Sequence, residues 1–209
     1  MCSTIKQGGF TMDHTKFKAG SELRERVLLV AGRLFTEGGY PNVSMRRIAS
    51  EIGCSQMAMY RHFPDKEALM QQLCIDLYER FTLKLHESLD QLESPLERLR
   101  QAMRQFVTLS VKNPHHYKLV FLDPAANAQG SELRSKVADP ALEYISRNLR
   151  LALPSDTPEE VIEERLHQLV ACMHGMSVLL LTYPRVYRIT KETALRELEC
   201  IFRLLLEPH

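Results

Sequence analysis

The chain has 209 residues, of which 44% are hydrophobic and 25% are charged, and this composition excludes a fibrous or low-complexity protein. The formal net charge is +1, but the charges are unevenly distributed along the chain. Residues 1–63 carry nine Lys/Arg and five Asp/Glu, net +4, whereas residues 64–209 carry 18 Lys/Arg and 21 Asp/Glu, net −3. A basic front on an acidic body favours an anionic partner for the front, although a net charge of +4 also arises by chance.

Membrane and secreted classes are disfavoured as well. No apolar run approaches the roughly 20 residues that cross a bilayer, and Gln7, Gly8, Gly9 and Asp13 interrupt the N-terminus where a signal peptide needs an apolar core. The five cysteines are odd in number and show no Cys-x-x-Cys spacing, so reduced thiols are expected in place of disulfides or a zinc site. We therefore expect a cytoplasmic protein with no cofactor, no metal and no membrane contact.

The N-terminal part begins with a polar segment and continues as a helix. Residues 1–20 contain glycine and lack a hydrophobic period, which predicts a disordered tail, and Met12 within it is a second candidate for the natural start. Ser21 is placed to cap the first helix, and Gly38-Gly39 is placed to end it.

Two shorter helices are predicted next. Ser44 is placed to cap a helix that Gly53 ends, because glycine adopts the left-handed conformation at the lowest cost. Ser55 is placed to cap a third helix that continues to about His62. With the first helix, these two predict a helix-turn-helix domain over residues 21–66.

A helical body is predicted for residues 67–209. Its first helix opens at Pro64-Asp65, and two later start signals combine a capping box with Pro at the first helical position: Ser94-Pro95-Leu96-Glu97 and Thr157-Pro158-Glu159-Glu160. The later helices are expected over 95–112, from Asn113-Pro114 to Asp123-Pro124, over 131–152 with a break or kink at Asp139-Pro140, over 158–183 before Pro184, and from a cap at Thr190 onward. Because no segment alternates with period two, the predicted fold class is all-α with about nine helices.

The outer face of the third helix favours a DNA-binding function. Ile48, Ile52 and Met59 are placed to form a core beneath it, which leaves in solvent Gln56, Met57, Tyr60 and Arg61. An exposed short helix of this composition fits the major groove of DNA, which admits one α-helix. A small helical bundle without this function is the alternative on these features alone.

Residues 44–69 also carry a pattern of fixed residues: Ser44-x-x-x-Ile48-Ala49-x-x-x-Gly53-x-Ser55-x-x-x-x-Tyr60-x-His62-Phe63-x-x-Lys66-x-x-Leu69. With Phe35 and the ending Gly38-Gly39-Tyr40, it resembles the TetR family of regulators over about residues 21–70. The resemblance implies that base edges are read by Arg46, Gln56 and Met57. It implies phosphate contacts from Ser44, Tyr60, His62 and Lys66, with further candidates at Ser55, Arg47 and Arg61. Arginine can bind guanine in a fork, glutamine can bind adenine and methionine can touch a thymine methyl, so the chemistry agrees; for Arg47 and Arg61 a merely solvated charge is the alternative.

The resemblance further implies a ligand-responsive repressor that binds a pseudo-palindromic double-stranded DNA operator as a homodimer. In this family the last two helices of two subunits usually pack as a four-helix bundle. The residues expected at that interface are Ala171, Gly175, Leu198, Ile201, Phe202 and Leu205.

Part of the body is similar to the TetR subgroup named for a Trp-His-Gly triplet, through Asn113-Pro114, Tyr117, Phe121 and His174-Gly175, although Met173 stands where the Trp would be. A pocket for a small, largely apolar effector is expected among Met103, Phe106, Tyr117, Phe121, Tyr144, Val170, Met173 and His174. Such residues also form ordinary helical cores, so core packing is the alternative for each of them.

An enzyme is the main rival class, because the histidines could form a metal site: His115, His116, His167 and His174. His167 and His174 are seven residues apart on one helix, about 10.5 Å along its axis, which is too far for one ion. No Ser-His-Asp signature, Gly-rich phosphate loop or His-Glu-x-x-His motif occurs, so we expect no catalysis. A helical interaction protein that has lost DNA binding is the third class, and the joint presence of Tyr60, His62 and Lys66 argues against it.

Overall fold

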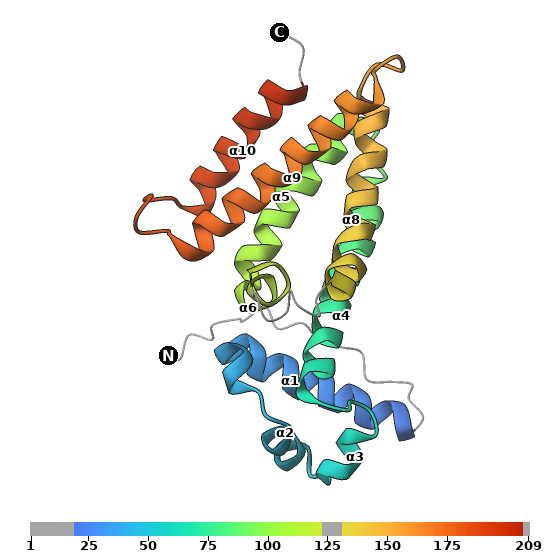
Figure 1. Cartoon of the computed structure of the whole chain (residues 1–209), viewed down its shortest axis with the longest axis vertical. Helices are drawn as coiled ribbons and strands as arrows, with labels where there is room; N and C mark the ends of the chain where they lie inside the picture. The colour runs from blue at the N-terminus through green and yellow to red at the C-terminus, as the bar shows by residue number, and fades with distance from the viewer. Residues whose placement is uncertain (1–18, 123–130, 207–209) are drawn as a thin grey trace, which may run out of the picture.

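The computed structural model describes residues 19–122 and 131–206, and the regular structure within them is helical throughout (Figure 1). The α-helices are α1 (Ala19–Asn42), α2 (Met45–Ile52), α3 (Gln56–Tyr60), α4 (Lys66–Leu89), α5 (Pro95–Lys112), α6 (Pro114–Tyr117), α8 (Ser131–Ala152), α9 (Glu159–Thr182) and α10 (Lys191–Leu206). A π-helical turn, η1 (Lys118–Leu122), follows α6 directly. The predicted all-α class is thus confirmed. The predicted tail at 1–20, apart from its last two residues, and the predicted stop at Asp123-Pro124 lie outside the described residues.

The N-terminal unit has its own apolar core. Helices α1, α2 and α3 bury the side chains of Val27, Leu34, Phe35, Ile48 and Met59 against one another. The same core includes Leu69, Met70 and Leu73 of α4. The first two turns of α4 therefore pack with the N-terminal unit, beyond residue 66, the predicted end of that domain.

The C-terminal body is a bundle in which α4, α5, α8, α9 and α10 surround a second core. Figure 1 shows α4 running from the N-terminal unit into this bundle, so one continuous helix belongs to both parts. Helices α9 and α10 lie side by side, and both pack against α5. Among the described residues, no helix combines the length and the apolar character needed to cross a bilayer.

Most helix boundaries agree with their sequence signals, and four positions differ. Helix α1 runs past the predicted stop at Gly38-Gly39 to Asn42, with non-helical φ and ψ at Gly39. Ser21 lies inside α1, which begins at Ala19. Thr157 does not cap α9: Pro158 occupies that position with no side-chain hydrogen bond, and the Thr157 N–H donates to the Pro154 carbonyl oxygen in the preceding turn. Helix α8 continues through the exposed Pro140. Proline lacks the N–H for one hydrogen bond of the helix. Because Val137 and Tyr144 are buried on either side of Pro140, packing of this face keeps the helix continuous.

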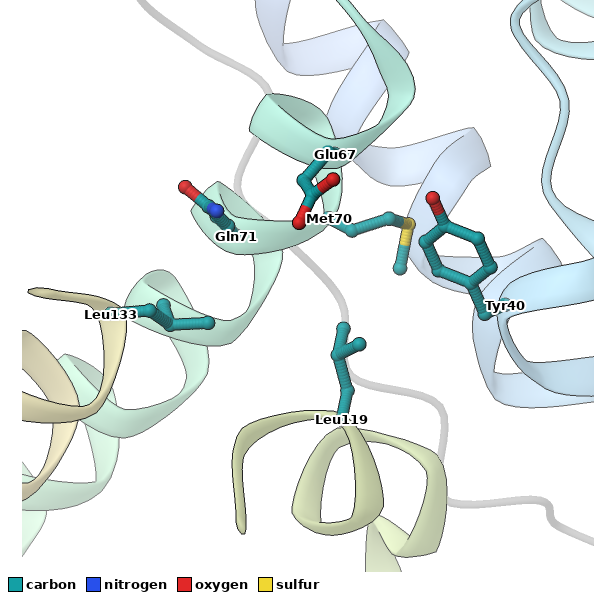
Figure 2. Close-up of a pocket in the computed structure, with 6 residues that line it drawn as sticks. All are labelled: Tyr40, Glu67, Met70, Gln71, Leu119 and Leu133. Carbon is teal, nitrogen blue, oxygen red and sulfur yellow. The ribbon is translucent and has the colours of Figure 1, made fainter. Parts of the chain in front are cut away.

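The two parts of the molecule meet in a nearly filled junction. Figure 2 shows Tyr40 from the end of α1, Met70 and Gln71 from the start of α4, Leu119 from η1 and Leu133 from α8 converging there. The cavity between them has a volume of only about 20 Å³, which is room for about one water molecule. If η1 or α8 moves at this junction, little free space is available to take up the movement, so the side chains of α1 and α4 have to move as well.

Candidate nucleic-acid interface and effector site

Helix α2 is fixed at both ends, as predicted. Ser44 Oγ accepts a hydrogen bond from the backbone N–H of Arg47 at 3.1 Å, which satisfies one amide that a helix start leaves open. Gly53 ends the helix in the left-handed conformation, with φ 70° and ψ 37°. The Ser44 hydroxyl hydrogen remains able to donate to a phosphate oxygen while its oxygen caps the helix.

Helix α3 presents one buried and one open face. Ser55 Oγ accepts from the Ala58 N–H at 3.2 Å and caps the helix, while Met59 is fully buried beneath it. On the outer face, Met57 is 69% exposed and Tyr60 is 44% exposed, and Gln56 beside them is exposed as well. The side chains predicted to reach DNA are therefore the ones that α3 does not use for packing.

The two adjacent arginines of α2 differ in their partners. The exposed Arg46 guanidinium forms no ion pair with any residue of the described ranges. Arg47, by contrast, donates from Nη1 to Asn42 Oδ1 at 2.7 Å, and its Nε lies 3.4 Å from Glu51 Oε1. Arg46 is thus available for a base edge, whereas Arg47 is already held along the protein surface.

Lys66, at the start of α4, has a partner that the sequence did not indicate. Its Nζ donates to the Tyr40 carbonyl oxygen at 2.6 Å and lies 3.7 Å from the centroid of the Tyr40 ring. Partial burial lowers the pKa of Lys66 below its usual value. Two of the three ammonium N–H groups remain for a phosphate, so the residue can both tie α1 to α4 and meet DNA.

The other predicted contacts lie beside these. Arg61 is exposed and His62 is half-buried at the end of α3. Two contacts that steady the unit had no sequence signal, because they join residues far apart in the chain: Arg26 donates to the Ile52 carbonyl oxygen at 2.6 Å, and the Arg24 guanidinium lies 5.3 Å from the Phe63 ring centroid. Which of the predicted residues touch DNA stays a prediction.

The N-terminal unit resembles a known protein family in sequence. Residues 27–73 match the family model described as bacterial regulatory proteins, tetR family. Residues 27–73 thus resemble the DNA-binding part of TetR-family regulators, and we call this part of the chain the TetR domain. The match covers α2, α3 and the flanking parts of α1 and α4, which are the elements that position the exposed face of α3.

Curated relatives resemble this chain over the same part. The nucleoid occlusion factor SlmA of Vibrio campbellii is 30% identical over 92 residues, 44% of this chain and 47% of that protein. An HTH-type transcriptional regulator of Staphylococcus aureus strain USA300 is 46% identical over 52 residues, 25% of this chain and 28% of that protein. The chain thus aligns with half or less of the length of these relatives.

Solved structures show the same fold over nearly the whole chain. A protein of Saccharomonospora viridis solved in complex with choline has a TM-score of 0.70 and 21% identity, covering 88% of this chain and 96% of its own. The transcriptional regulator FadR of Bacillus subtilis, solved in complex with stearoyl-CoA, has a TM-score of 0.66 and 15% identity, covering 88% and 99%. At these identities the likeness establishes the fold, so the body that follows the TetR domain has to be interpreted from its own residues.

Four of the eight predicted pocket residues meet in that body. The rings of Phe106 (α5), Tyr117 (α6), Phe121 (η1) and His174 (α9) pack with centroid separations of 4.8–6.3 Å. We call these four residues the aromatic cluster. Tyr117 Oη lies 2.9 Å from His174 Nδ1, and burial raises the pKa of Tyr117 to about 12, which keeps its hydroxyl protonated.

The other predicted pocket residues are placed differently. Met103 and Met173 are buried in the same core, 1% and 2% exposed, and Val170 is half-buried against it. Tyr144 packs instead on His86, with ring centroids 4.8 Å apart, and beneath Arg147. It therefore belongs to the part of the bundle that the C-terminal half of α4 lines.

The predicted dimer residues divide between two faces. Ala171 and Gly175 are exposed on α9, and Ile201 and Leu205 are half-buried on α10. Leu198 and Phe202 are only 2% and 1% exposed, because they pack inside the protomer's own core. The exposed apolar side chain of α10 is Leu204, at 65%, which the sequence reasoning did not single out.

The histidines considered for a metal site occupy separate surroundings. His115 and His116 pack against Phe35 of the TetR domain, with ring centroids 5.9 and 4.7 Å away. His174 belongs to the aromatic cluster, and His167 is exposed on α9. Within the described ranges no three His, Cys, Asp or Glu side chains are grouped as metal ligands would be, and the cysteines found there, Cys54, Cys74, Cys172 and Cys200, are free thiols.

Proposed function

We propose that the protein is a ligand-responsive transcriptional repressor that binds a pseudo-palindromic operator as a homodimer. The observation that carries the proposal is the outer face of α3, where Gln56, Met57 and Tyr60 stand exposed on a helix whose other face is buried. A capped helix with polar and aromatic side chains on its open face matches what a recognition helix offers to the major groove.

In this proposal base reading and phosphate binding come from different residues. Arg46, Gln56 and Met57 read base edges, while Ser44, Ser55, Tyr60, Arg61, His62 and Lys66 hold the phosphates. Arg47 joins the second group by exchanging its contact with Glu51 for one with DNA. The phosphate contacts supply most of the affinity and make it fall with salt, whereas base contacts supply the sequence preference.

Dimerisation supplies the second recognition helix. The exposed small residues Ala171 and Gly175, four positions apart on α9, allow a second copy to approach closely, and Leu204 offers it exposed apolar surface on α10. Two identical helices then read half-sites that are one helical turn apart, about 34–36 Å.

The effector is proposed to act on the aromatic cluster, through α6. Tyr117 of α6 bonds to His174 in the body, while the adjacent His116 packs on Phe35 of the TetR domain. A ligand that separates Tyr117 from His174 displaces a helix of only four residues that touches both parts. The neighbours solved with choline and with stearoyl-CoA support a ligand-binding role for this fold. By linkage, a ligand shifts operator affinity only if it prefers one of the two arrangements.

The experiment is binding to genomic fragments selected in vitro, followed by fluorescence anisotropy on the selected site. Gln56→Ala is expected to relax the preference at one base pair by roughly 1–3 kcal/mol while leaving non-specific binding unchanged. Tyr60→Phe, which removes only the hydroxyl, is expected to weaken every sequence equally. If Gln56→Ala weakens all sequences to the same degree, the base-reading assignment is wrong.

A reporter fused to the selected site tests the sign of regulation. Deleting the protein is expected to raise transcription from that site, and a fall would make the protein an activator. Failure to select any fragment would reject DNA binding itself.

A further inference from the structure

The body carries a groove that the proposed function does not use. It lies between α4, α5 and α10 and has a volume of about 480 Å³, within the range of about 300–1,000 Å³ usual for small-molecule sites. It is lined by Phe81 and Lys84 of α4, by Gln101, Arg104, Gln105, Thr108, Leu109 and Lys112 of α5, and by Lys191 and Leu195 of α10. We call it the basic groove.

The charge of this lining opposes that of the body around it. Four of the ten lining residues are cationic, Lys84, Arg104, Lys112 and Lys191, and none is acidic, whereas residues 64–209 as a whole carry 18 basic and 21 acidic residues. Like charges gathered in a hollow repel one another, and an anion in the hollow relieves that repulsion. The groove therefore attracts anions more strongly than the net charge of the body would suggest.

Two acids, Glu97 and Glu192, lie next to lining residues of the groove, and each interacts with several groups, lining residues among them. Glu97 lies beyond the Gln101 end of the groove, where it accepts from Gln101 at 2.7 Å and from Arg100 at 2.5 Å. Glu192 follows Lys191, and its pKa is lowered chiefly by its own backbone N–H at the start of α10, then by Thr190, with Lys191 and Arg196 contributing. Lys112 makes no ion pair with a described residue.

The register of the helices places the cations at both ends of the groove. Arg104 approaches the Leu195 carbonyl oxygen at 3.5 Å, and Arg100 pairs with Glu199 at 3.0 Å, so α5 and α10 run antiparallel. Lys191 therefore lies toward the Lys112 end of the groove. On α5, Lys112 is about 12 Å along the helix axis from Arg104. It is also the first residue of the 16-residue α10, whose N-terminal dipole adds to the positive potential.

The floor between these ends is apolar. Phe81 is 7% exposed, and Leu109 and Leu195 are half-buried, while the long cationic side chains form the rim. Phe81 also packs on Phe106 of the aromatic cluster, with ring centroids 6.3 Å apart, so the two sites share one wall. An apolar floor beneath a cationic rim is complementary to a molecule that has an apolar part and an anionic head.

We infer that the basic groove binds an anionic amphiphile, a small molecule with a phosphate or carboxylate head and a short apolar tail. The head pairs with Lys112 and Lys191 at the start of α10, and the tail covers Phe81, Leu109 and Leu195. This site differs in place and chemistry from the aromatic cluster, and the inference holds whether or not the chain represses transcription.

The test is isothermal titration calorimetry of the full chain with hexyl phosphate at low salt. Inorganic phosphate lacks the tail and hexyl glucoside lacks the charge, and each is expected to bind at least about tenfold more weakly. Hexanoate distinguishes the two heads: tighter binding of hexyl phosphate assigns a phosphate head, and tighter binding of hexanoate assigns a carboxylate head.

The variant Lys112→Gln/Lys191→Gln is expected to bind hexyl phosphate roughly tenfold more weakly, because two partly exposed charge pairs are lost. The matched control Lys118→Gln/Arg185→Gln removes two exposed cations outside the groove and is expected to bind like the wild type. Thermal melting of both variants checks that they fold. Unchanged binding by the groove variant, equal binding of inorganic phosphate, or no binding of hexyl phosphate or hexanoate would each overturn the inference.

Discussion

Two glycines of the DNA-binding unit have a positive φ, but only one of them is also enclosed. Gly53 lies at φ 70°, ψ 37°, and a Cβ there would meet nothing within 4 Å. Gly39 lies at φ 71°, ψ −166°, a region that is essentially restricted to glycine, and a Cβ there would lie 2.8 Å from His115 Nδ1. Gly39 thus ends the regular part of α1 and lets α6 approach it.

The two positions predict different costs for the same substitution. Gly39→Ala is expected to lower the free energy of unfolding by roughly 3 kcal/mol, since backbone strain and a steric clash add. Gly53→Ala is expected to cost roughly 1 kcal/mol, from the left-handed backbone alone. Urea unfolding of both variants measures the difference, and equal losses would mean that the contact between Gly39 and His115 does not constrain the fold.

Lys66 is the residue at which a structural contact and a proposed DNA contact overlap. Lys66→Met keeps the aliphatic stem but removes the hydrogen bond to the Tyr40 carbonyl oxygen and the charge over its ring. We expect a loss of roughly 1–2 kcal/mol in the free energy of unfolding and a shallower dependence of DNA affinity on salt, by about one phosphate contact. Urea unfolding and anisotropy over a salt series separate the two effects, and an unchanged salt slope would leave Lys66 only its structural role.

At the scale of elements, α6 packs against both the C-terminal body and the TetR domain. His116 is buried against Phe35, and this burial, with the nearby charges of His115 and Arg80, lowers its pKa to about 4. Between pH 6.5 and 4, His116 is therefore protonated in the unfolded chain but stays neutral in the folded chain. The stability contributed by neutral His116 is fully present above pH 6.5 and is lost as the pH falls through about 4.

This linkage predicts a loss of about 3 kcal/mol in the free energy of unfolding between pH 6.5 and 4. In His116→Gln, which has no proton to gain, most of that slope is expected to disappear, whatever the variant's stability at pH 7. Urea unfolding at a series of pH values checks this. In the upper part of this pH range the carboxylates contribute little to the slope, because their ordinary pKa values lie near 4 and below. A slope that persists in the variant would place the titrating group elsewhere.

Elements whose signals are local were predictable, and arrangements that depend on packing were not. Ser44, Ser55, Ser94 and Thr190 each accept the expected backbone hydrogen bond, because a cap involves only residues three positions apart. Thr157 carries the same signal but does not cap its helix: Pro158 takes the cap position, and the Thr157 N–H closes a turn with Pro154.

The face that a helix turns toward its neighbours is decided by tertiary packing. Leu198, Ile201, Phe202 and Leu205 form one apolar run on α10, and the sequence does not tell which of them meets the protomer and which could meet a second copy. Burial of Leu198 and Phe202 in the protomer core decides that question for two of them. The basic groove was missed for the same reason, since its cations are spread over three helices.

At the scale of the whole molecule, the proposed function requires two copies of the chain, and Gly175 offers a clean test of that requirement. It is exposed on α9, and a Cβ built there would meet no atom within 4 Å. The protomer thus has no need of glycine at this position. A glycine inside a helix lowers stability by roughly 1 kcal/mol relative to alanine. Close approach by a second chain would explain why glycine stands here.

Gly175→Arg is therefore expected to leave the protomer folded but to place a long charged side chain in the proposed interface. Sedimentation equilibrium should show the wild type as a dimer and the variant as a monomer. Because a monomer reads one half-site without the partner's effective concentration, operator affinity is expected to fall roughly a hundredfold. Leu83→Arg, at an exposed apolar residue of α4 outside the proposed interface, is the matched control and should remain a dimer. A dimeric Gly175→Arg variant with full operator affinity would move the interface away from this face of α9, and a monomeric wild type that still binds its operator tightly would reject the dimer model itself.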